Sequence, residues 1–209
     1  MLTLHDNLGS GNAYKVRLML TLLGRRFRRI EYDVTQGETR TPEFLKINPN
    51  GRIPALVFED GRVLTESNAI LFYLATDTEF LPQEKFERAQ ALQWMFFEQY
   101  SHEPYIAVAR YWRHFIWDEI SRDESKMREL EDKMEKGHAA LAVMDQHLAT
   151  RAYFVGERFS IADIALCAYT HVADEGGFDL APYSNVTRWL SRVAGQPRYA
   201  PITRSDFET

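Results

Sequence analysis

The sequence predicts an α/β domain over residues 1–77 and an all-helical domain over residues 86–209, joined by a linker at 78–85. In the first part, short apolar runs alternate with helical stretches in the order βαβ and then αββα, which predicts a mixed four-stranded sheet. After about residue 84 the apolar residues recur only at helical spacing. With 209 residues and 45% hydrophobic residues, the chain is long enough for two packed cores.

The first half contains four strand predictions and three helix predictions. Met1–His5 places Leu2 and Leu4 on one face of a strand, and a helix then runs from Ala13 until Gly24 stops it. Asp60-Gly61 is typical of a hairpin turn. The remaining elements are strands at 27–34, 53–59 and 62–64, a short helix opened by Thr41-Pro42, and a helix after Glu66-Ser67.

The second half is helical throughout. Residues 86–117 form one long apolar stretch that Pro104 should kink or break. Residues 127–148 carry one buried stripe, on which Gly137 indicates the close approach of a neighbouring helix. Ser160 and Asp163 have the spacing of a capping box at the start of a very apolar helix. A last helix around 186–193 should end at Gly195 and Pro197.

Composition excludes several classes of function. The net charge of −5 gives no reason to expect a nucleic-acid partner. The single cysteine, Cys167, excludes an internal disulfide and a four-cysteine metal site, and no metal is expected. The N-terminus lacks the pattern of a signal peptide and no apolar run is long enough to span a bilayer, so we expect a cytoplasmic protein without a membrane partner.

Four segments in register resemble the soluble glutathione transferases. They are the βαβ–αββα order, the segment Asn48-Pro49-Asn50-Gly51-Arg52-Ile53-Pro54-Ala55-Leu56, the segment Glu66-Ser67-Asn68-Ala69-Ile70, and Ser160-Ile161-Ala162-Asp163 in a helical tail. The start, Ser10-Gly11-Asn12-Ala13-Tyr14-Lys15-Val16-Arg17, is similar to the serine-type classes (phi, tau, zeta and theta) and their bacterial relatives. The resemblance implies a thioredoxin-like domain that binds glutathione, followed by a helical bundle.

Activating glutathione means favouring its thiolate, which is the nucleophile. The resemblance places the activating hydroxyl at Ser10, just before the first helix, where the helix N-terminus would also favour negative charge. Asn12 is the rival donor to the sulfur, and Tyr14 is a third candidate whose hydroxyl should point away. Ser10 could also be a plain helix cap. We expect Ser10→Ala to keep glutathione binding and to lose most turnover.

Two further segments would hold the rest of the peptide. The resemblance implies a cis bond at Ile53-Pro54, where the Ile53 backbone could pair with the cysteinyl part of glutathione. It also places Arg40 against the glycyl carboxylate, with Arg52 as a weaker candidate. A solvated loop arginine and an edge-strand proline without a ligand are the alternatives.

Glu66 and Ser67 precede a helix, so Ser67 and nearby backbone N–H groups could hold the γ-glutamyl carboxylate while Glu66 accepts from the ammonium group. Either residue could instead be an ordinary helix cap.

The electrophile pocket is expected along the first long helix of the second domain, at Tyr105, Val108, Tyr111, Trp112 and Phe115. Aromatic residues at helical spacing also line cores, so the second substrate cannot be identified. The leading hypothesis is a homodimeric enzyme that conjugates glutathione to a small hydrophobic electrophile. The alternatives are a non-catalytic interaction module of the same fold, or glutathione-dependent peroxidase, dehalogenase or isomerase chemistry.

Overall fold

A computed structural model describes residues 1–204 of the chain, and these divide into two compact units. The first unit contains residues 1–78 and the C-terminal segment 196–204, and the second contains residues 79–195. The predicted fold class is confirmed: an α/β unit with a four-stranded sheet and a mostly helical unit. The C-terminal segment belongs to the first unit, whereas the sequence pattern placed it with the helical domain.

The first unit is built on one mixed sheet with strand order β2-β1-β3-β4. β1 is parallel to β2 and antiparallel to β3, and β4 pairs antiparallel with β3 through the predicted hairpin. Leu4 and Leu56 face each other across β1 and β3 and are fully buried. The strands are β1 (Leu2–Asp6), β2 (Phe27–Glu31), β3 (Ala55–Val57) and β4 (Val63–Thr65).

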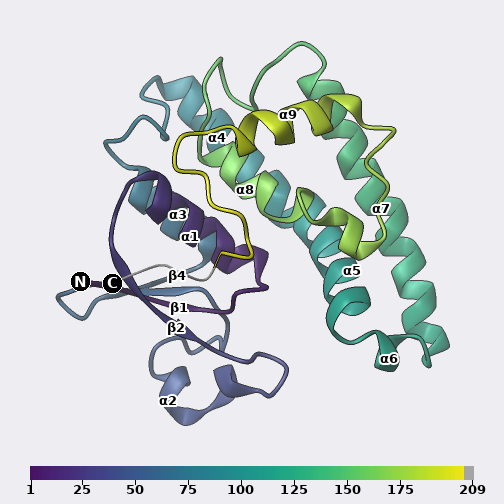
Figure 1. The fold of residues 1–209 in the computed structure, drawn as a ribbon, viewed down its shortest axis with the longest axis horizontal. Helices are drawn as coiled ribbons and strands as arrows, with labels where there is room; N and C mark the ends of the chain where they lie inside the picture. The colour runs from purple at the N-terminus through teal and green to yellow at the C-terminus, as the bar shows by residue number, and fades with distance from the viewer. Residues whose placement is uncertain (205–209) are drawn as a thin grey trace. The chain divides into compact units, whose positions relative to one another are not determined.

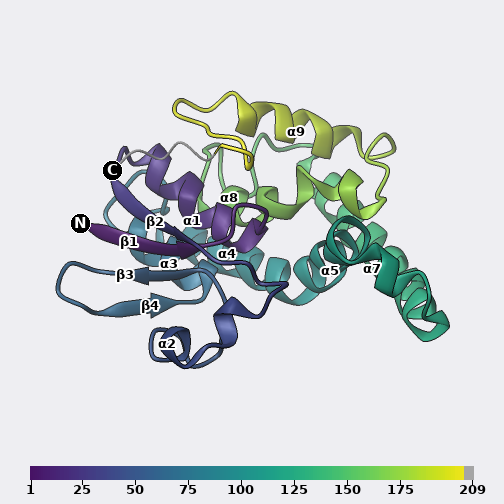
Figure 2. The same cartoon turned by 60° about the horizontal axis from the view of Figure 1, so that its bottom comes forward.

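Three helices complete this unit: α1 (Gly11–Leu22), α2 (Pro42–Leu45) and α3 (Ser67–Ala75), with a 3-10 turn at Glu38–Arg40. α1 and α3 lie side by side on one face of the sheet, and α2 lies on the other (Figures 1 and 2). Both α1 and α3 begin at the end of a strand, so their N-termini come together at one end of the sheet. This convergence positions the candidate site.

Strands β2 and β3 are shorter than the sequence predicts. The chain leaves β2 after Glu31, and its next turn is held by Asp33, whose carboxylate accepts from the backbone N–H groups of Thr35 and Gln36. β3 begins only at Ala55 because Pro54 has no N–H to donate to a ladder. The apolar pattern extends beyond the hydrogen-bonded part in both cases.

The C-terminal segment returns to α1. The hydroxyl of Tyr14 donates to the backbone oxygen of Ala200 at 2.8 Å, and Arg17 donates to that of Ile202 at 3.3 Å. Ala200 and Ile202 are themselves buried. This segment therefore completes the core of the first unit, which a helical-period search of the sequence cannot detect.

The second unit consists of helices and short turns. Pro104 lies in the first turn of α5, and the turn before it is a π-helix, so the expected kink or break takes the form of a change of helix type within an uninterrupted helical run. The elements are α4 (Lys85–Phe97), the π-helix Glu98–His102, α5 (Glu103–Phe115), α6 (Trp117–Ile120), α7 (Glu124–Leu148), α8 (Ile161–Thr170), the 3-10 turn Ala173–Gly176 and α9 (Ser184–Ala194).

α8 is the central helix of this unit, and all ten of its residues are buried. The predicted capping box at its start is present: Asp163 accepts from the backbone N–H of Ser160, whose side chain caps the helix. Asp163 also accepts from the indole of Trp189 on α9 at 2.8 Å. The box thus joins α8 to α9 as well as capping the start of α8.

The stripe of α7 is buried as predicted, at positions including Leu130, Leu141 and Met144. A Cβ on Gly137 would lie 2.5 Å from the ring of Phe178 and 3.3 Å from Ile106 of α5. Close packing at Gly137 is therefore confirmed, although the nearest neighbour is an aromatic ring that follows the 3-10 turn.

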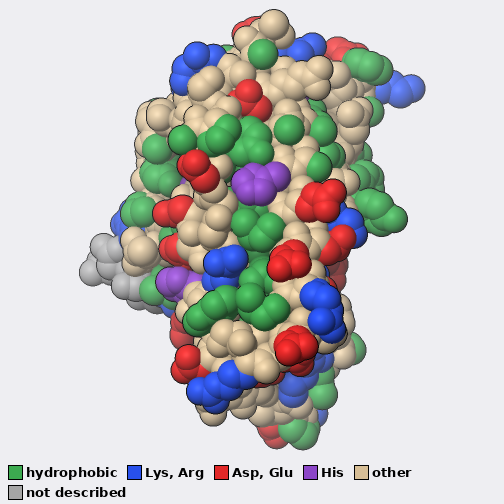
Figure 3. Space-filling model, turned by 90° about the vertical axis from the view of Figure 1, so that its right-hand side faces the viewer, with side chains coloured by type: hydrophobic (Ala, Val, Ile, Leu, Met, Phe, Trp, Pro, Cys, Tyr) green, Lys and Arg blue, Asp and Glu red, His purple; other side chains and the backbone are tan. Residues whose placement is uncertain are grey.

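The surface shows acidic, basic and hydrophobic side chains intermixed on the face drawn in Figure 3. Within residues 1–204, none of the helices combines the length and apolar character that a bilayer crossing requires.

Candidate functional site

Arg17 anchors the loop between β1 and α1. This fully buried guanidinium pairs with the buried carboxylate of Asp6 at 2.6 Å. It also donates to the backbone oxygens of Asn7 at 3.2 Å and Leu8 at 2.7 Å. Because these two residues lead directly into Ser10, the ion pair fixes the path of the loop that carries the predicted sulfur ligands.

Ser10 is the N-cap of α1. Its Oγ accepts from the backbone N–H of Ala13 at 3.3 Å, so the capping alternative is real, and the hydroxyl hydrogen can still donate to a ligand. Asn12 lies in the first turn and is partly exposed. The hydroxyl of Tyr14 is bonded to Ala200 in the core, as expected for a residue that points away from the site.

The structure brings the first helix and the third helix into contact at their N-termini. Oγ of Ser67 lies 3.1 Å from Oδ1 of Asn12, although the two residues are 55 positions apart. Two of the predicted site residues, one assigned to the sulfur and one to the γ-glutamyl carboxylate, are therefore neighbours. Both stand where helix N–H groups favour an anion.

Glu66 has an unusual backbone. It precedes α3 with φ 65° and ψ 111°, and its side chain makes no capping bond. A non-glycine residue in this region costs about 1–3 kcal/mol and is typically kept where a ligand is bound. The strain and the exposed side chain fit a ligand contact better than an ordinary cap.

The turn before β3 is shaped by Asn48. Its buried side chain donates to the backbone oxygen of Arg52 at 2.6 Å and accepts from the N–H of Asn50 at 3.0 Å. The Ile53-Pro54 bond that follows is cis, as the resemblance implies. Arg52 is exposed beside it.

Arg40 is exposed and is already engaged with this turn. It donates to the backbone oxygen of Asn50 at 2.9 Å and packs over Gly51, where a Cβ would lie 2.5 Å from its Nη1. The guanidinium therefore supports the turn, in addition to any role toward a carboxylate.

The five residues predicted for the electrophile pocket all lie on α5, and the structure divides them. Lys126 and Lys133 of α7 cover the ring of Trp112 at 4.8 and 5.2 Å, and Lys136 covers that of Tyr105 at 5.6 Å. These two rings therefore serve the packing of α5 against α7.

The other three, Val108, Tyr111 and Phe115, share a less buried face, on which the rings of Tyr111 and Phe115 stack at 5.7 Å. Their contact with an electrophile stays a prediction.

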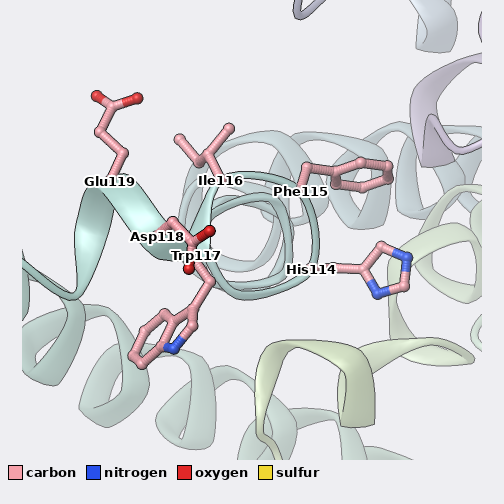
Figure 4. A pocket seen from close by; sticks show the side chains of 6 residues that line it. All are labelled: His114, Phe115, Ile116, Trp117, Asp118 and Glu119. Carbon is pink, nitrogen blue, oxygen red and sulfur yellow. The ribbon is translucent and has the colours of Figure 1, made fainter.

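A hollow of about 380 Å³ lies where α5 meets α6. It is lined by consecutive residues from His114 to Glu119, and of the predicted pocket set it includes Phe115. The side chains radiate from the helix end and do not converge on a common point (Figure 4). The hollow therefore lacks the convergent polar groups that define a small-molecule site.

Burial shifts the pKa values of the thiol of Cys167 and the imidazole of His5 away from their ordinary values. Burial, with a smaller effect from the charge of Asp163, raises the pKa of the Cys167 thiol above its usual range. Burial and then the nearby charge of Arg28 lower the pKa of His5 at the end of β1. Within residues 1–204, the acidic, histidine and cysteine side chains form no group suited to a metal ion.

Comparisons with known proteins agree with this arrangement. The N-terminal domain family of glutathione S-transferases matches residues 1–76, and the C-terminal domain family matches residues 93–197. The crystal structure of a glutathione S-transferase from Pseudomonas fluorescens Pf-5 is 49% identical with a TM-score of 0.92, covering 97% of this chain and 99% of its own. The chain belongs to the glutathione S-transferase family.

Other members of the glutathione S-transferase fold are more distant. The disulfide-bond oxidoreductase YfcG of Escherichia coli K12 is 32% identical over 193 residues, which cover 89% of this chain and 87% of YfcG. Yeast Ure2p in complex with glutathione is 27% identical with a TM-score of 0.82, covering 94% of this chain and 95% of its own. Glutathione is thus a ligand of neighbours in this family.

Sequence reasoning missed three residues that shape the site: Lys15, Arg17 and Asn48. Lys15 and Arg17 are fully buried on a helix whose sequence shows an apolar stripe, so a periodicity search reads them as solvent-facing. The Asn12–Lys15 spacing of three was the one available signal, since such residues are neighbours on a helix.

Proposed function

We propose that the protein is a glutathione transferase that adds the glutathione thiolate to a small hydrophobic electrophile. The observation that supports it best is the contact between Asn12 at the start of α1 and Ser67 at the start of α3. The residue predicted for the sulfur and a residue predicted for the γ-glutamyl carboxylate are thus neighbours, which supports a single peptide site. Family membership and the glutathione complex of Ure2p support the same ligand.

In the proposed site the γ-glutamyl carboxylate lies against the first turn of α3, and Glu66 accepts from the ammonium group. The cysteinyl backbone lies along Ile53 and Pro54, next to β3, and Arg40 or Arg52 meets the glycyl carboxylate. The sulfur then reaches the N-terminus of α1, where Ser10 and Asn12 are the candidate donors. Each proposed contact pairs a polar or charged group of glutathione with a protein group of the complementary hydrogen-bonding type.

The proposed chemistry begins with loss of the thiol proton to solvent. Lowering the thiol pKa by ~2 units from about 8.5 requires about 2.7 kcal/mol of preferential stabilisation of the thiolate. One hydrogen bond to a charged group and the helix N-terminus are together of that size. The thiolate then forms a bond to the electrophilic carbon, and the leaving group, for example chloride, departs with the electron pair.

Binding to immobilised glutathione, calorimetry and conjugation to a chlorinated nitroaromatic test the proposal. We expect binding and turnover, and we expect whichever of Ser10→Ala and Asn12→Ala removes the donor to the sulfur to lower kcat more than it raises KM. Ser121→Ala, an exposed serine of the other unit, is the matched control. Binding without turnover would indicate an interaction module, and no heat with millimolar glutathione would refute the proposal.

Glutathione-dependent disulfide reduction is the second candidate, and the resemblance to YfcG favours it. The buried Cys167 cannot serve as the attacking thiol, so bound glutathione would attack the disulfide itself. Its thiolate would form one new S–S bond and release one thiolate, and a second glutathione would then yield the oxidised dimer. Oxidation of glutathione by a small disulfide, measured beside the conjugation assay, separates the two activities.

We also propose a homodimer, because the described helical unit exposes large apolar side chains on one helix. Phe86, Phe96 and Tyr100 on α4 and the π-helix that follows are 69%, 70% and 84% exposed. Exposed apolar groups of this size, gathered on one element, commonly mark a protein interface.

A further inference from the structure

Lys15, near the start of α1, has no exposed surface. Nζ of Lys15 is 2.9 Å from Oδ1 of Asn12 and 3.3 Å from Oγ of Ser67. Since Ser67 is also 3.1 Å from Asn12, the three side chains form a closed triangle of hydrogen bonds. This triangle joins the starts of α1 and α3. An ammonium group is costly to bury, so its place beneath the site calls for a specific role.

The ammonium group fixes the direction of these hydrogen bonds. Lysine has only donors, so the Asn12 atom that faces it must be the carbonyl oxygen, and a flipped amide would set donors against donors. The hydroxyl of Ser67 accepts from Lys15 and directs its own hydrogen to Asn12. Because the amide is planar, its Nδ2 group then points away from both Lys15 and Ser67.

We propose that Lys15 is a positioning residue that makes Asn12 the hydrogen-bond donor to the glutathione sulfur. This inference rests on the proposed function, because it names the group that would hold the thiolate. A donor to sulfur favours the ionised form of the thiol. Since Lys15 sets the amide orientation before glutathione arrives, the donor is preorganised and little reorganisation is needed during the reaction.

With Asn12 as the donor to the sulfur, Ser10 and Ser67 have other roles. Ser10 is the cap of α1 through its bond from the N–H of Ala13. The hydroxyl hydrogen of Ser67 is directed at Asn12, so the γ-glutamyl carboxylate is held by backbone N–H groups in the first turn of α3.

A double-mutant cycle tests the coupling. Lys15→Met removes the ammonium group and keeps the chain length, and we expect kcat for conjugation to fall about 10- to 100-fold, the effect of losing one hydrogen bond to a charged group. KM for glutathione should change less. Asn12→Ala should show a similar loss, and the double variant should be no slower than Asn12→Ala alone, since Lys15 acts through Asn12. Lys85→Met, an exposed lysine of α4, is the matched control and should keep the original kcat.

Two readouts separate positioning from mere stability. Thermal unfolding shows whether each variant is folded, and the ultraviolet absorbance of bound thiolate at neutral pH should fall in Lys15→Met. If the two single losses multiply in the double variant, or if folded Lys15→Met keeps its kcat, the proposal is overturned.

A measurement on the unaltered protein covers the case in which Lys15→Met does not fold. The Nδ2 resonances of Asn12, observed by NMR and assigned by their loss in Asn12→Ala, should shift on adding glutathione. They should shift less with the analogue in which a methyl group replaces the thiol. Equal shifts, or none while both peptides bind, overturn the role of Asn12. Failure of both peptides to bind overturns the proposed function together with this inference.

Discussion

At the scale of single residues, Tyr14 is close in sequence to the proposed donors to the sulfur, but its hydroxyl is bonded in the core. It lies within four residues of Ser10, but its hydroxyl donates to Ala200 and its ring is buried. We expect Tyr14→Phe to keep full kcat with a chlorinated nitroaromatic, while the free energy of unfolding falls by about 1 kcal/mol through loss of one hydrogen bond. A large loss of kcat in a folded variant would mean that this hydroxyl reaches the sulfur.

Asp163 gives a prediction about pH. Burial raises the pKa of Asp163 from 3.8 to about 6, against the opposing effect of hydrogen bonds from Trp189, Ser160 and Phe154. Between these two values the folded state keeps a proton that the unfolded state has lost. The contribution of Asp163 to the free energy of unfolding is therefore greatest below pH 4 and declines as the pH rises through 6.

The comparison of the original protein with Asp163→Asn isolates this effect, because asparagine does not titrate. We expect the variant to be less stable by about 1–3 kcal/mol at pH 7, since an amide N–H₂ would face donors in a buried site. The difference should widen toward pH 4 in denaturant titrations. A difference that narrows toward pH 4 would show that the hydrogen bonds outweigh burial.

The sequence could assign structural roles to those residues whose hydrogen-bond partners lie a few positions away in the chain. The box of Ser160 and Asp163 needs only a spacing of three, and it is present. Arg17 has no such local signature, and Lys15 has only its spacing of three from Asn12, because their partners Ser67, Asp6 and Ile202 are fixed by the tertiary fold. Buried polar residues whose partners are distant in sequence remain invisible to periodicity.

At the scale of elements, Gly176 shows how closely the 3-10 turn after α8 packs on α5. A Cβ at this position would lie 2.9 Å from the backbone nitrogen of Arg110 and 3.2 Å from its Cα. Because helix backbone cannot yield as a side-chain end can, we expect Gly176→Ala to lower the free energy of unfolding by about 1–3 kcal/mol.

The control is Gly195→Ala at the end of α9 in the same unit. Its Cβ would meet nothing closer than 3.5 Å, and its φ of −81° suits alanine. We expect a change within about 0.5 kcal/mol, as for an ordinary surface substitution. Chemical denaturation of both variants measures the contrast, and similar stabilities would contradict the close packing at Gly176.

Helices were easier to predict than strand ends for a physical reason. The change to π-helix next to Pro104 accompanies a missing N–H, and the stripe of α7 follows from a repeat of many residues. The ends of β2 and β3 depend on which backbone groups find a partner strand. A three-residue ladder such as Ala55–Val57 contains too few positions to reveal that in sequence.

At the scale of the whole molecule, the order of elements and the turn chemistry sufficed to predict two units and their fold class. The return of residues 196–204 to α1 could not be predicted. A segment without helical or strand periodicity gives no indication of the element against which it packs. Its anchors are backbone oxygens, which every residue possesses. Only the folded structure shows that Tyr14 and Arg17 use them.

At the same scale, we expect two copies of the chain to associate through an apolar side of α4. Phe96 and Tyr100 lie four residues apart on the continuous helix formed by α4 and the π-turn, so they occupy one side of it. A twofold axis would bring this apolar side against a partner copy through a self-complementary contact. We expect sedimentation to show twice the chain mass of 24.4 kDa.

The double variant Phe96→Glu, Tyr100→Glu should dissociate, because burying two carboxylates without partners costs several kcal/mol. Val143→Glu, an exposed apolar position on α7, is the matched control and should stay dimeric. A double variant that still sediments as a dimer would move the interface to another surface, and an original protein of 24.4 kDa in solution would exclude the dimer.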